Sequence, residues 1–144
     1  MTLYPWSLAR KVVFSQDPET AHGLAIKSLE KGLVPVSPKA RQARPHLAKT
    51  VAGLHFPNPV GIAAGFDKNG SVPLAILKQG FGFTEVGTTT PKPQAGNLKP
   101  RVFRLVDDEA MINRLGFNNE GHDAMARRLE RLPAKGQRGG IIAV

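Results

Sequence analysis

The chain has 144 residues, of which 41% are hydrophobic and 22% are charged. This length is typical of one domain, and the composition is that of a globular chain able to bury a core. The absence of cysteine excludes a disulfide framework, a thiolate metal site and a cysteine nucleophile within these residues. The 15 glycines and 12 prolines cluster between apolar runs, which indicates many short elements joined by turns.

The formal net charge of +9 raises the question of an anionic partner. Nucleic acid, anionic lipid and an anionic small molecule are the alternatives. We expect no nucleic acid, because no run of adjacent basic residues with interleaved aromatic residues occurs. No apolar run reaches the length of a membrane span. We also predict no signal peptide, because residues 1–14 have no small-residue cleavage site after an apolar core.

Residues 1–34 are predicted to form a small arm of two amphipathic helices, over residues 1–14 and 17–31. Asp17 is a good N-cap for the second helix, and Gly32 ends it. Helices this small cannot bury their apolar faces alone, so they are expected to pack on each other, on the rest of the protein or on a membrane surface. The predicted apolar face of the second helix consists of Ala21, Leu24, Ala25, Ser28 and Leu29.

Residues 35–50 are basic and rich in proline, and we interpret them as a linker. From residue 51 onward, strand and helix patterns alternate. The predicted strands are 51–56, 59–65, 83–90, two around a turn at 107–109, and 139–144, and the predicted helices are 71–80 and 118–132. Asn118 or Asn119 is the predicted N-cap of the last helix.

The alternating pattern favours an α/β fold with a parallel sheet covered by helices. The run Val60 to Ala64 is almost continuously apolar, as expected of a buried parallel strand. A (β/α)8 barrel has roughly 250 residues, whereas only about three parallel strands are predicted in residues 51–144. We therefore expect the sequence to be the N-terminal part of a longer protein.

Ligands of α/β folds lie beyond the carboxyl ends of the parallel strands, so the residues that follow the strands are candidate site residues. Gly65 follows the first strong strand and permits close approach of a planar ligand to the backbone, and Lys68 supplies a cation nearby. The alternative is that Gly65 only turns the chain and that Lys68 is a solvated loop residue.

A second group of candidates follows the next strand. Thr88, Thr89 and Thr90 offer hydroxyl and amide groups to a phosphate or a heterocycle, or alternatively they continue the strand. Asn113 has an amide that both donates and accepts, which suits the edge of a heterocycle, and a turn does not explain it. No metal site is predicted, because the histidines share no metal-ligand spacing; they are His22, His46, His55 and His122.

Several long motifs, found in the same order, resemble class 2 dihydroorotate dehydrogenase, the quinone-dependent and membrane-associated form. They are "DPETAH", "NPVGIAAGFDKNG" and "GFGFTEVGTTTPKPQAGNLKPRVFRLVDDEAMINRLGFNNEG". The resemblance implies the first part of a (β/α)8 TIM barrel, in residues 51–144, after a two-helix membrane-associating arm. It also implies FMN as cofactor and oxidation of dihydroorotate to orotate in pyrimidine synthesis, with electrons passing from FMN to ubiquinone.

The resemblance assigns roles to individual positions. Quinone-site residues match at His22 and Arg104, and the arm would admit quinone and lie on the membrane. Flavin-binding residues match at Ala64, Gly65, Phe66, Asp67, Lys68 and Thr88. Substrate-binding residues match at Lys68, Asn113, Arg114, Leu115, Gly116 and Phe117.

The family's catalytic serine is expected beyond Val144, so the 144-residue chain alone is expected to be inactive. The predicted location is the cytoplasmic face of a bacterial inner membrane, as a peripheral protein. An alternative is a non-catalytic remnant or interaction module that keeps the arm and part of the barrel. A soluble class 1 enzyme with another electron acceptor is a further alternative, which the arm disfavours.

Overall fold

The structure of the protein is a computed structural model that describes residues 6–41 and 44–144. Residues 1–5 of the predicted first helix lie outside the described residues. The helices are α1 (Trp6–Phe14), α2 (Pro18–Glu30), α3 (Pro73–Lys78) and α4 (His122–Glu130), with 3₁₀ turns at Pro38–Arg41, Pro45–Leu47 and Lys135–Gln137. The strands are β1 (Lys49–Val51), β2 (Leu54–Phe56), β3 (Gly61–Ile62), β4 (Phe83–Glu85), β5 (Val102–Leu105), β6 (Ala110–Asn113) and β7 (Ile141–Ala143).

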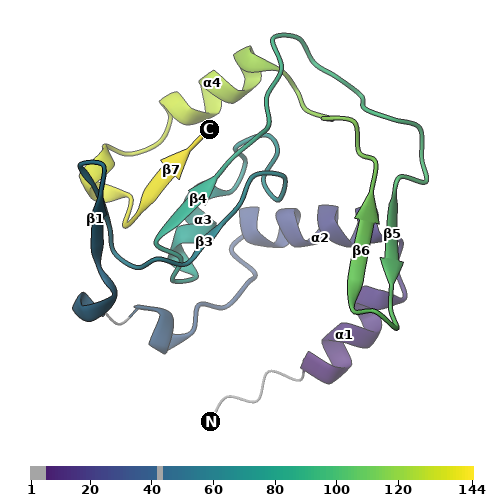
Figure 1. Cartoon of the computed structure of the whole chain (residues 1–144), viewed down its shortest axis with the longest axis horizontal. Coiled ribbons are helices and arrows are strands. Elements are labelled where there is room, and N and C mark those ends of the chain that lie inside the picture. Colours follow the sequence, from purple (N-terminus) through teal and green to yellow (C-terminus); the bar gives the residue numbers. More distant parts are fainter. Residues whose placement is uncertain (1–5, 42–43) are drawn as a thin grey trace.

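A parallel sheet with the strand order β3-β4-β7 lies on the opposite side of the molecule from the β5–β6 hairpin (Figure 1). Gly61 pairs with Phe83, and Thr84 pairs with Ile142. The connection from β3 to β4 contains α3, and the connection from β4 to β7 contains the β5–β6 hairpin and α4. Helices that connect neighbouring parallel strands define an α/β fold, so this prediction is confirmed.

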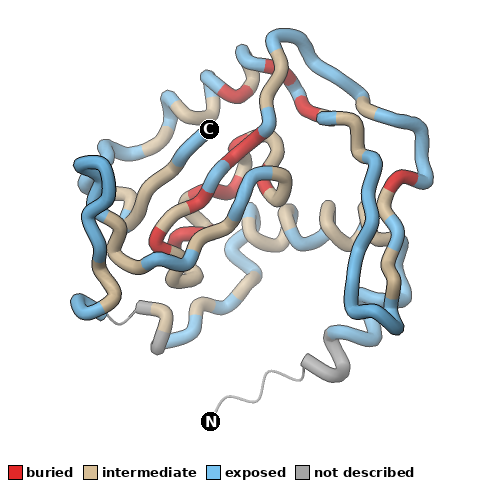
Figure 2. The backbone as a smooth tube through the Cα atoms, viewed as in Figure 1, coloured by how far each residue is buried: buried red, intermediate tan, exposed pale blue. Residues whose placement is uncertain are grey.

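The core lies between the parallel sheet and the helices α3 and α4. Figure 2 shows buried backbone concentrated on β4 and the segments beside it, whereas the β5–β6 hairpin is largely exposed. A Cβ atom at Gly70 would lie 2.7 Å from the Met125 sulfur, so α4 packs closely on the loop before α3. The buried apolar residues are Val72, Ile76, Leu77, Val86 and Met125.

The prediction of one strand over residues 51–56 is wrong, because this segment is part of a hairpin. β1 and β2 pair antiparallel, with Val51 opposite Leu54. The turn between them has positive φ at Ala52 (50°) and at Gly53 (77°). Phe56 of β2 packs edge-on against Phe83 of β4, with ring centroids 5.7 Å apart. Since β1 begins at Lys49, the hairpin also takes the last two residues of the predicted linker.

The parallel strand predicted from Val60 to Ala64 is present, but it is shorter and less buried than expected. Only Gly61 and Ile62 form strand β3, and Val60 is 59% exposed. β3 is an edge strand with β4 as its neighbour. A strand with only one neighbouring strand is less buried than a strand in the middle of a sheet, although its apolar sequence would suit full burial. The predicted strand over 83–90 is likewise shorter than expected, since β4 ends at Glu85.

Helix α2 begins as the sequence predicts, and its predicted apolar face is partly buried. The Asp17 carboxylate accepts a hydrogen bond from the Thr20 amide at 2.9 Å, which confirms the N-cap. Ala21, Ser28 and Leu29 of the predicted face are partly buried, whereas Leu24 is 52% exposed and Ala25 is also exposed, so this prediction is confirmed only in part. The helix contacts β5, α3 and α1. In the described part of the chain, no helix has the length and hydropathy needed to cross a bilayer.

Helix α4 begins later than predicted. Its N-cap is Gly121, and neither predicted asparagine caps it. The Asn119 carboxamide oxygen instead accepts hydrogen bonds from the Gly121 and Thr90 amides, at 2.8 and 3.1 Å. Asn119 therefore ties the segment before α4 to the loop that follows β4.

Candidate functional site

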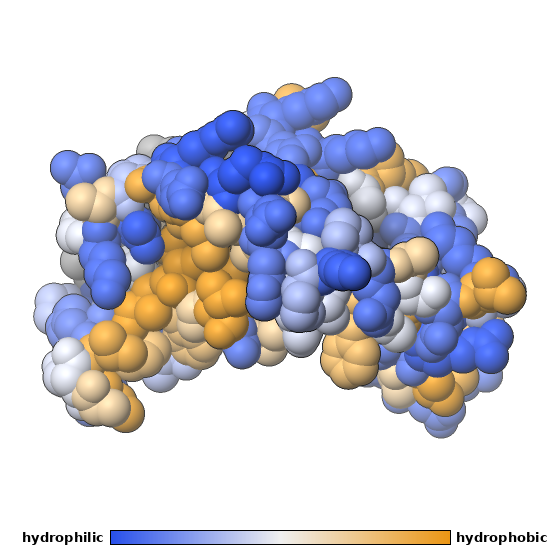
Figure 3. Space-filling view, turned by 90° about the horizontal axis from the view of Figure 1, so that it is seen from above, coloured by the Kyte–Doolittle hydropathy of each residue, from blue (hydrophilic) through white to orange (hydrophobic). Residues whose placement is uncertain are grey.

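A cavity of about 700 Å³ lies next to the ends of β3 and β4, facing the stretch after β6 and the start of α2. In the space-filling view, the molecule is hollowed between the half that holds the parallel sheet and the half that holds the β5–β6 hairpin (Figure 3). The volume is in the range of small-molecule sites. We call it the first cavity. The predicted residues that line it are His22, Ala64, Gly65, Phe66, Lys68, Thr88, Asn113, Arg114, Leu115, Gly116 and Phe117.

Gly65 and Lys68 form the part of the wall that follows β3. Gly65 has φ of 100°, and no atom of the described residues lies within 4 Å of where its Cβ would be. Its amide donates to the Gly87 carbonyl at 2.8 Å. The Lys68 ammonium donates to the Gly65 carbonyl at 2.5 Å. Burial lowers the pKa of Lys68, which is half-buried in this wall.

Asp67 differs from its predicted neighbours, since it does not line the first cavity. It is 2% exposed, and its carboxylate accepts hydrogen bonds from the Ser71 and Val72 amides at 2.8 and 2.7 Å. Its carbonyl accepts from the Gly87 amide at 3.0 Å. The Asp67 side chain thus holds the loop before α3 in shape, and its contact with a flavin stays a prediction.

The threonines after β4 have different surroundings. Thr88 lines the first cavity. The Thr89 hydroxyl is buried and has no hydrogen-bond partner among the described residues. The Thr90 hydroxyl donates to the Lys92 carbonyl at 2.6 Å. Of the three, Thr88 is therefore the one placed to meet a ligand.

The stretch Asn113–Phe117 is held from behind by the loop before β5. The Asn97 side-chain amide donates to the Arg114 carbonyl at 2.7 Å, and its backbone amide donates to the Leu115 carbonyl at 3.0 Å. The Gln94 side-chain amide donates to the Gly116 carbonyl at 2.8 Å. These bonds fix the backbone of the stretch, while Phe117 is left 66% exposed at the cavity wall.

Replacing Gly96 by alanine is expected to displace this stretch. Gly96 has φ of 76°, and an added Cβ would lie 2.2 Å from the Leu115 carbonyl oxygen, which is backbone and cannot rotate away. We expect a loss of about 2 kcal/mol or more in the free energy of unfolding of the chain, measured in urea. Gly136→Ala is the control, because nothing lies within 4 Å of its added Cβ. Equal stability of the two variants would contradict the close approach.

Sequence reasoning missed several residues of the first cavity, among them Glu19, Asn97 and Asn118. Glu19 belongs to the motif "DPETAH", but a favourable charge in the first turn of a helix already explains a glutamate there. The Asn118 carboxamide oxygen is buried and finds no hydrogen-bond donor among the described residues. Asparagine in a glycine-rich segment signals a turn as readily as a ligand, so the pattern alone did not identify either asparagine.

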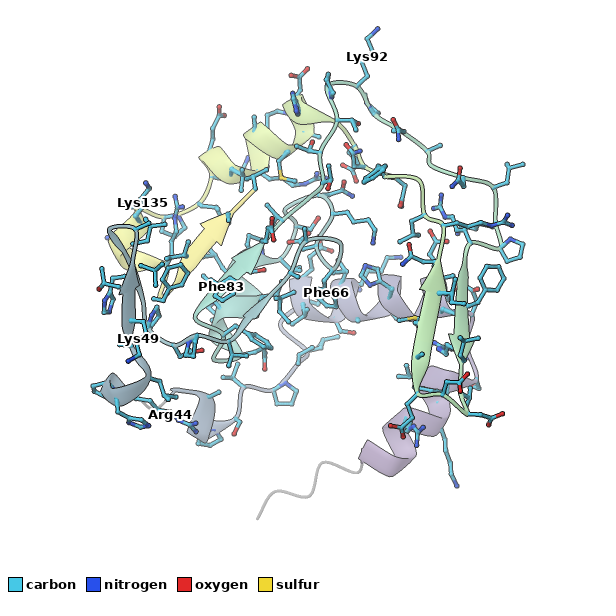
Figure 4. All side chains as sticks on the ribbon, viewed as in Figure 1. Arg44, Lys49, Phe66, Phe83, Lys92 and Lys135 are labelled. Carbon is cyan, nitrogen blue, oxygen red and sulfur yellow. The ribbon has the colours of Figure 1, made fainter. Side chains whose placement is uncertain are left out.

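His22 and Arg104, the predicted quinone residues, meet at a second cavity of about 620 Å³. The Arg104 guanidinium lies over the Phe14 ring, 4.8 Å from its centroid, and donates to the Gln16 carbonyl at 2.7 Å. His22 packs edge-on against Phe66 with centroids 5.2 Å apart. Figure 4 places Phe66 between α2 and the parallel sheet.

The two cavities share part of their walls, which consists of the rings of His22 and Phe66 together with Pro18 and Met111. Burial lowers the pKa of His22, and the nearby Lys68 charge lowers it further. The imidazole is therefore neutral around pH 7. In residues 6–41 and 44–144, no three or more His, Cys, Asp or Glu side chains are grouped as metal ligands.

Comparisons with known proteins identify the class of protein. The family model described as dihydroorotate dehydrogenase matches residues 46–143. The chain belongs to the dihydroorotate dehydrogenase family.

The curated relatives carry the name of the quinone form. Dihydroorotate dehydrogenase (quinone) of Rhizobium meliloti is 66% identical over 123 residues, which is 85% of this chain and 33% of the relative. The protein of the same name from Rhizobium etli is 62% identical over 129 residues, covering 90% of this chain and 35% of the relative. This chain thus spans about a third of the length of the curated relatives that it matches.

A solved structure agrees with the sequence comparison. The crystal structure of DHODH from Eimeria tenella in complex with ferulenol is 44% identical and superimposes with a TM-score of 0.82, over 92% of this chain and 38% of that one. This likeness implies an α/β fold of the TIM-barrel type, as the sequence predicted.

Proposed function

We propose that this chain supplies the flavin and substrate cavity of a quinone-dependent dihydroorotate dehydrogenase. The reaction is oxidation of dihydroorotate to orotate in pyrimidine biosynthesis, with electrons passing through FMN to ubiquinone. One observation carries the proposal: residues 64–66 with Lys68, and residues 113–117 far from them in sequence, line one cavity together with Thr88.

The residues of the first cavity fit a flavin and an anionic pyrimidine. The open space beside Gly65 admits a planar ring against the backbone. The buried Asn118 oxygen, which has no donor among the described residues, is an acceptor for a ligand N–H. Bound FMN would supply the electron acceptor that the protein's own side chains lack.

The side chains of the first cavity have complementary tasks in this proposal. Lys68 brings a positive charge to a partly buried wall, where it stabilises the carboxylate of orotate and negative charge on the cofactor. Asn113 offers both a donor and an acceptor to the ring edge of the substrate. The hydrogen bonds that fix the backbone at Leu115 and Gly116 help to hold the neighbouring Asn113 side chain in place.

The second cavity is the proposed quinone site. Its wall combines apolar groups, including the Phe14 and Phe66 rings, with the polar groups of His22 and Arg104. This mixture suits a ring with carbonyl oxygens. The neutral imidazole of His22 is able to donate one hydrogen bond without adding a charge to the cavity.

We further propose that the arm lies on the cytoplasmic face of a bacterial inner membrane, as a peripheral contact. The support is a group of exposed apolar residues on α1 and α2, which are Val12, Val13, Phe14 and Leu24. Arg10 and Lys11 add positive charge beside them, which favours anionic lipid headgroups.

The proposed function is tested in a chimaera in which residues 1–144 replace the matching part of the Rhizobium etli relative. We expect the purified chimaera to bind FMN and to reduce ubiquinone with dihydroorotate. In the variant Arg104→Ala, we expect at least about a tenfold loss of quinone reduction, with flavin reduction by dihydroorotate unchanged.

Two outcomes would contradict the proposal. A folded chimaera without flavin absorbance would refute the proposed enzyme function and favour a non-catalytic module. Equal losses of flavin reduction and quinone reduction in Arg104→Ala would show that the second cavity is not a separate quinone site.

A further inference from the structure

An ion pair outside the predicted site joins the arm to the rest of the protein. The Arg101 guanidinium donates to both carboxylate oxygens of Glu19, from Nη2 at 2.5 Å and from Nε at 3.1 Å. The Arg101 side chain is only 7% exposed, and that of Glu19 is 20% exposed. A bidentate pair of this kind is both strong and directional. Glu19 lies in the first turn of α2, and Arg101 directly precedes β5.

The remaining guanidinium nitrogen of Arg101 binds the support of the substrate stretch. Nη1 donates to the carbonyls of Ala95 and Asn97 at 2.7 and 2.9 Å, and it lies 3.5 Å from the Leu115 carbonyl. The Arg101 carbonyl in turn accepts from the Arg114 amide at 2.8 Å. One side chain thus contacts the arm, the loop at 95–97 and the back of the cavity wall.

We propose that Glu19 and Arg101 are a positioning pair, which couples the seating of the arm helix α2 to the geometry of the substrate stretch Asn113–Phe117. The inference rests on the proposed function only in naming that stretch as the substrate side of the site. Neither residue is required to touch the reacting atoms. Their action passes through the carbonyls of Asn97 and Leu115.

The burial of the ion pair explains why its loss would displace the backbone segments that Arg101 contacts. A guanidinium this buried needs its carboxylate partner, because loss of that partner leaves an uncompensated charge. Glu19 has a second cationic neighbour, Lys99, whose ammonium lies 3.5 Å from the Glu19 carboxylate. Because the Lys99 side chain is 66% exposed, this ion pair contributes little. With Glu19 neutralised, Arg101 is expected to turn toward solvent and to release the carbonyls that it binds.

The pair also acts on the charge of the first cavity. The hydrogen bond from Arg101 lowers the pKa of Glu19, so the carboxylate stays ionised. The negative charge of Glu19 raises the pKa of Lys68, and the positive charge of Arg101 lowers it. These two effects on the pKa of Lys68 have opposite signs, so removing the charge of either residue leaves the effect of the other charge on Lys68 uncompensated.

Hydrogen exchange of the 144-residue chain itself tests the coupling. In Glu19→Gln and in Arg101→Lys, we expect about tenfold faster exchange of the Asn97 and Arg114 amides. These amides donate to the carbonyls of Leu115 and Arg101, whose positions the ion pair is proposed to fix. The matched control is Glu30→Gln, an equal charge change on an exposed residue of the same helix. It should leave both rates unchanged.

Unchanged rates in both pair variants would overturn the proposal. Loss of protection throughout β3, β4 and β7 in both variants would also overturn it, because the pair would then hold the whole fold. Exchange confined to α2, with residues 95–97 and 113–117 still protected, would show that the two segments are not coupled.

A second measurement in the chimaera separates this inference from the proposed function. Glu19→Gln should raise KM for dihydroorotate about tenfold and change kcat by less than about twofold, as expected for loss of binding geometry. A loss confined to kcat would contradict the positioning role. Since hydrogen exchange needs no substrate, an inactive chimaera would refute the function while the coupling stays independently tested.

Discussion

Replacing Lys68 by alanine in the chimaera is expected to slow flavin reduction by dihydroorotate by about 100-fold or more. The ammonium lies in a half-buried wall, where a charge is less screened than in water. It also donates a hydrogen bond to the Gly65 carbonyl, so its removal is expected to loosen the backbone beside the proposed flavin position. Stopped-flow absorbance of the flavin under single-turnover conditions measures this rate directly.

Two further variants make the Lys68 result specific. Lys68→Arg keeps the charge and should be slowed less than Lys68→Ala, although the larger head group does not fit the same position. Lys135→Ala removes an equal charge from an exposed 3₁₀ turn, and Figure 4 shows Lys135 at the far side of the parallel sheet from Phe66, which lines the first cavity. It should reduce flavin at the parent rate. The assignment of Lys68 fails if Lys68→Ala does the same.

Replacing Asp67 by alanine is expected to lower the free energy of unfolding of the chain by about 3 kcal/mol, because two hydrogen bonds to a charged group are lost. The Val72 amide is then left buried without its acceptor. Urea denaturation followed by circular dichroism measures the change through its midpoint, provided that the slope of the transition stays constant.

The matched control for Asp67 is Asp107→Ala, which removes an exposed carboxylate from the β5–β6 turn and should change stability by less than about 0.5 kcal/mol. Asp67→Asn keeps one acceptor oxygen and should give an intermediate loss. If Asp67→Ala is as stable as the parent but binds FMN poorly in the chimaera, the residue acts on the cofactor and its structural role is refuted.

The elements with local signals were predictable from the sequence. Asp17 caps α2 by its own side chain, and the acidic turn at 107–109 separates two strands of alternating residues. The β1–β2 turn had only Gly53 as a local signal, because its other central residue, Ala52, takes a positive φ that alanine seldom adopts. The exposure of Val60 depends on the number of strand neighbours, which an apolar run does not encode.

The site was predictable where its residues follow strands or belong to long motifs. Gly65, Lys68 and Asn113 come from such places, and all three line the first cavity. The ion pair was not predictable, because Glu19 and Arg101 are 82 positions apart and each has an ordinary local explanation. A charge at a helix start and a basic residue before a strand reveal their partnership only when the chain is folded.

The shared wall of His22 and Phe66 limits how this protein can evolve. Each ring faces a cavity on either side, so a mutation that reshapes one binding site for a new ligand reshapes the other as well. Adaptation of either site must therefore proceed through residues that belong to one cavity only, such as Thr88 on one side or Arg104 on the other. Pro18 and Met111 also line both cavities, so these two residues and the two rings are the positions at which selection on both proposed ligands would act at once.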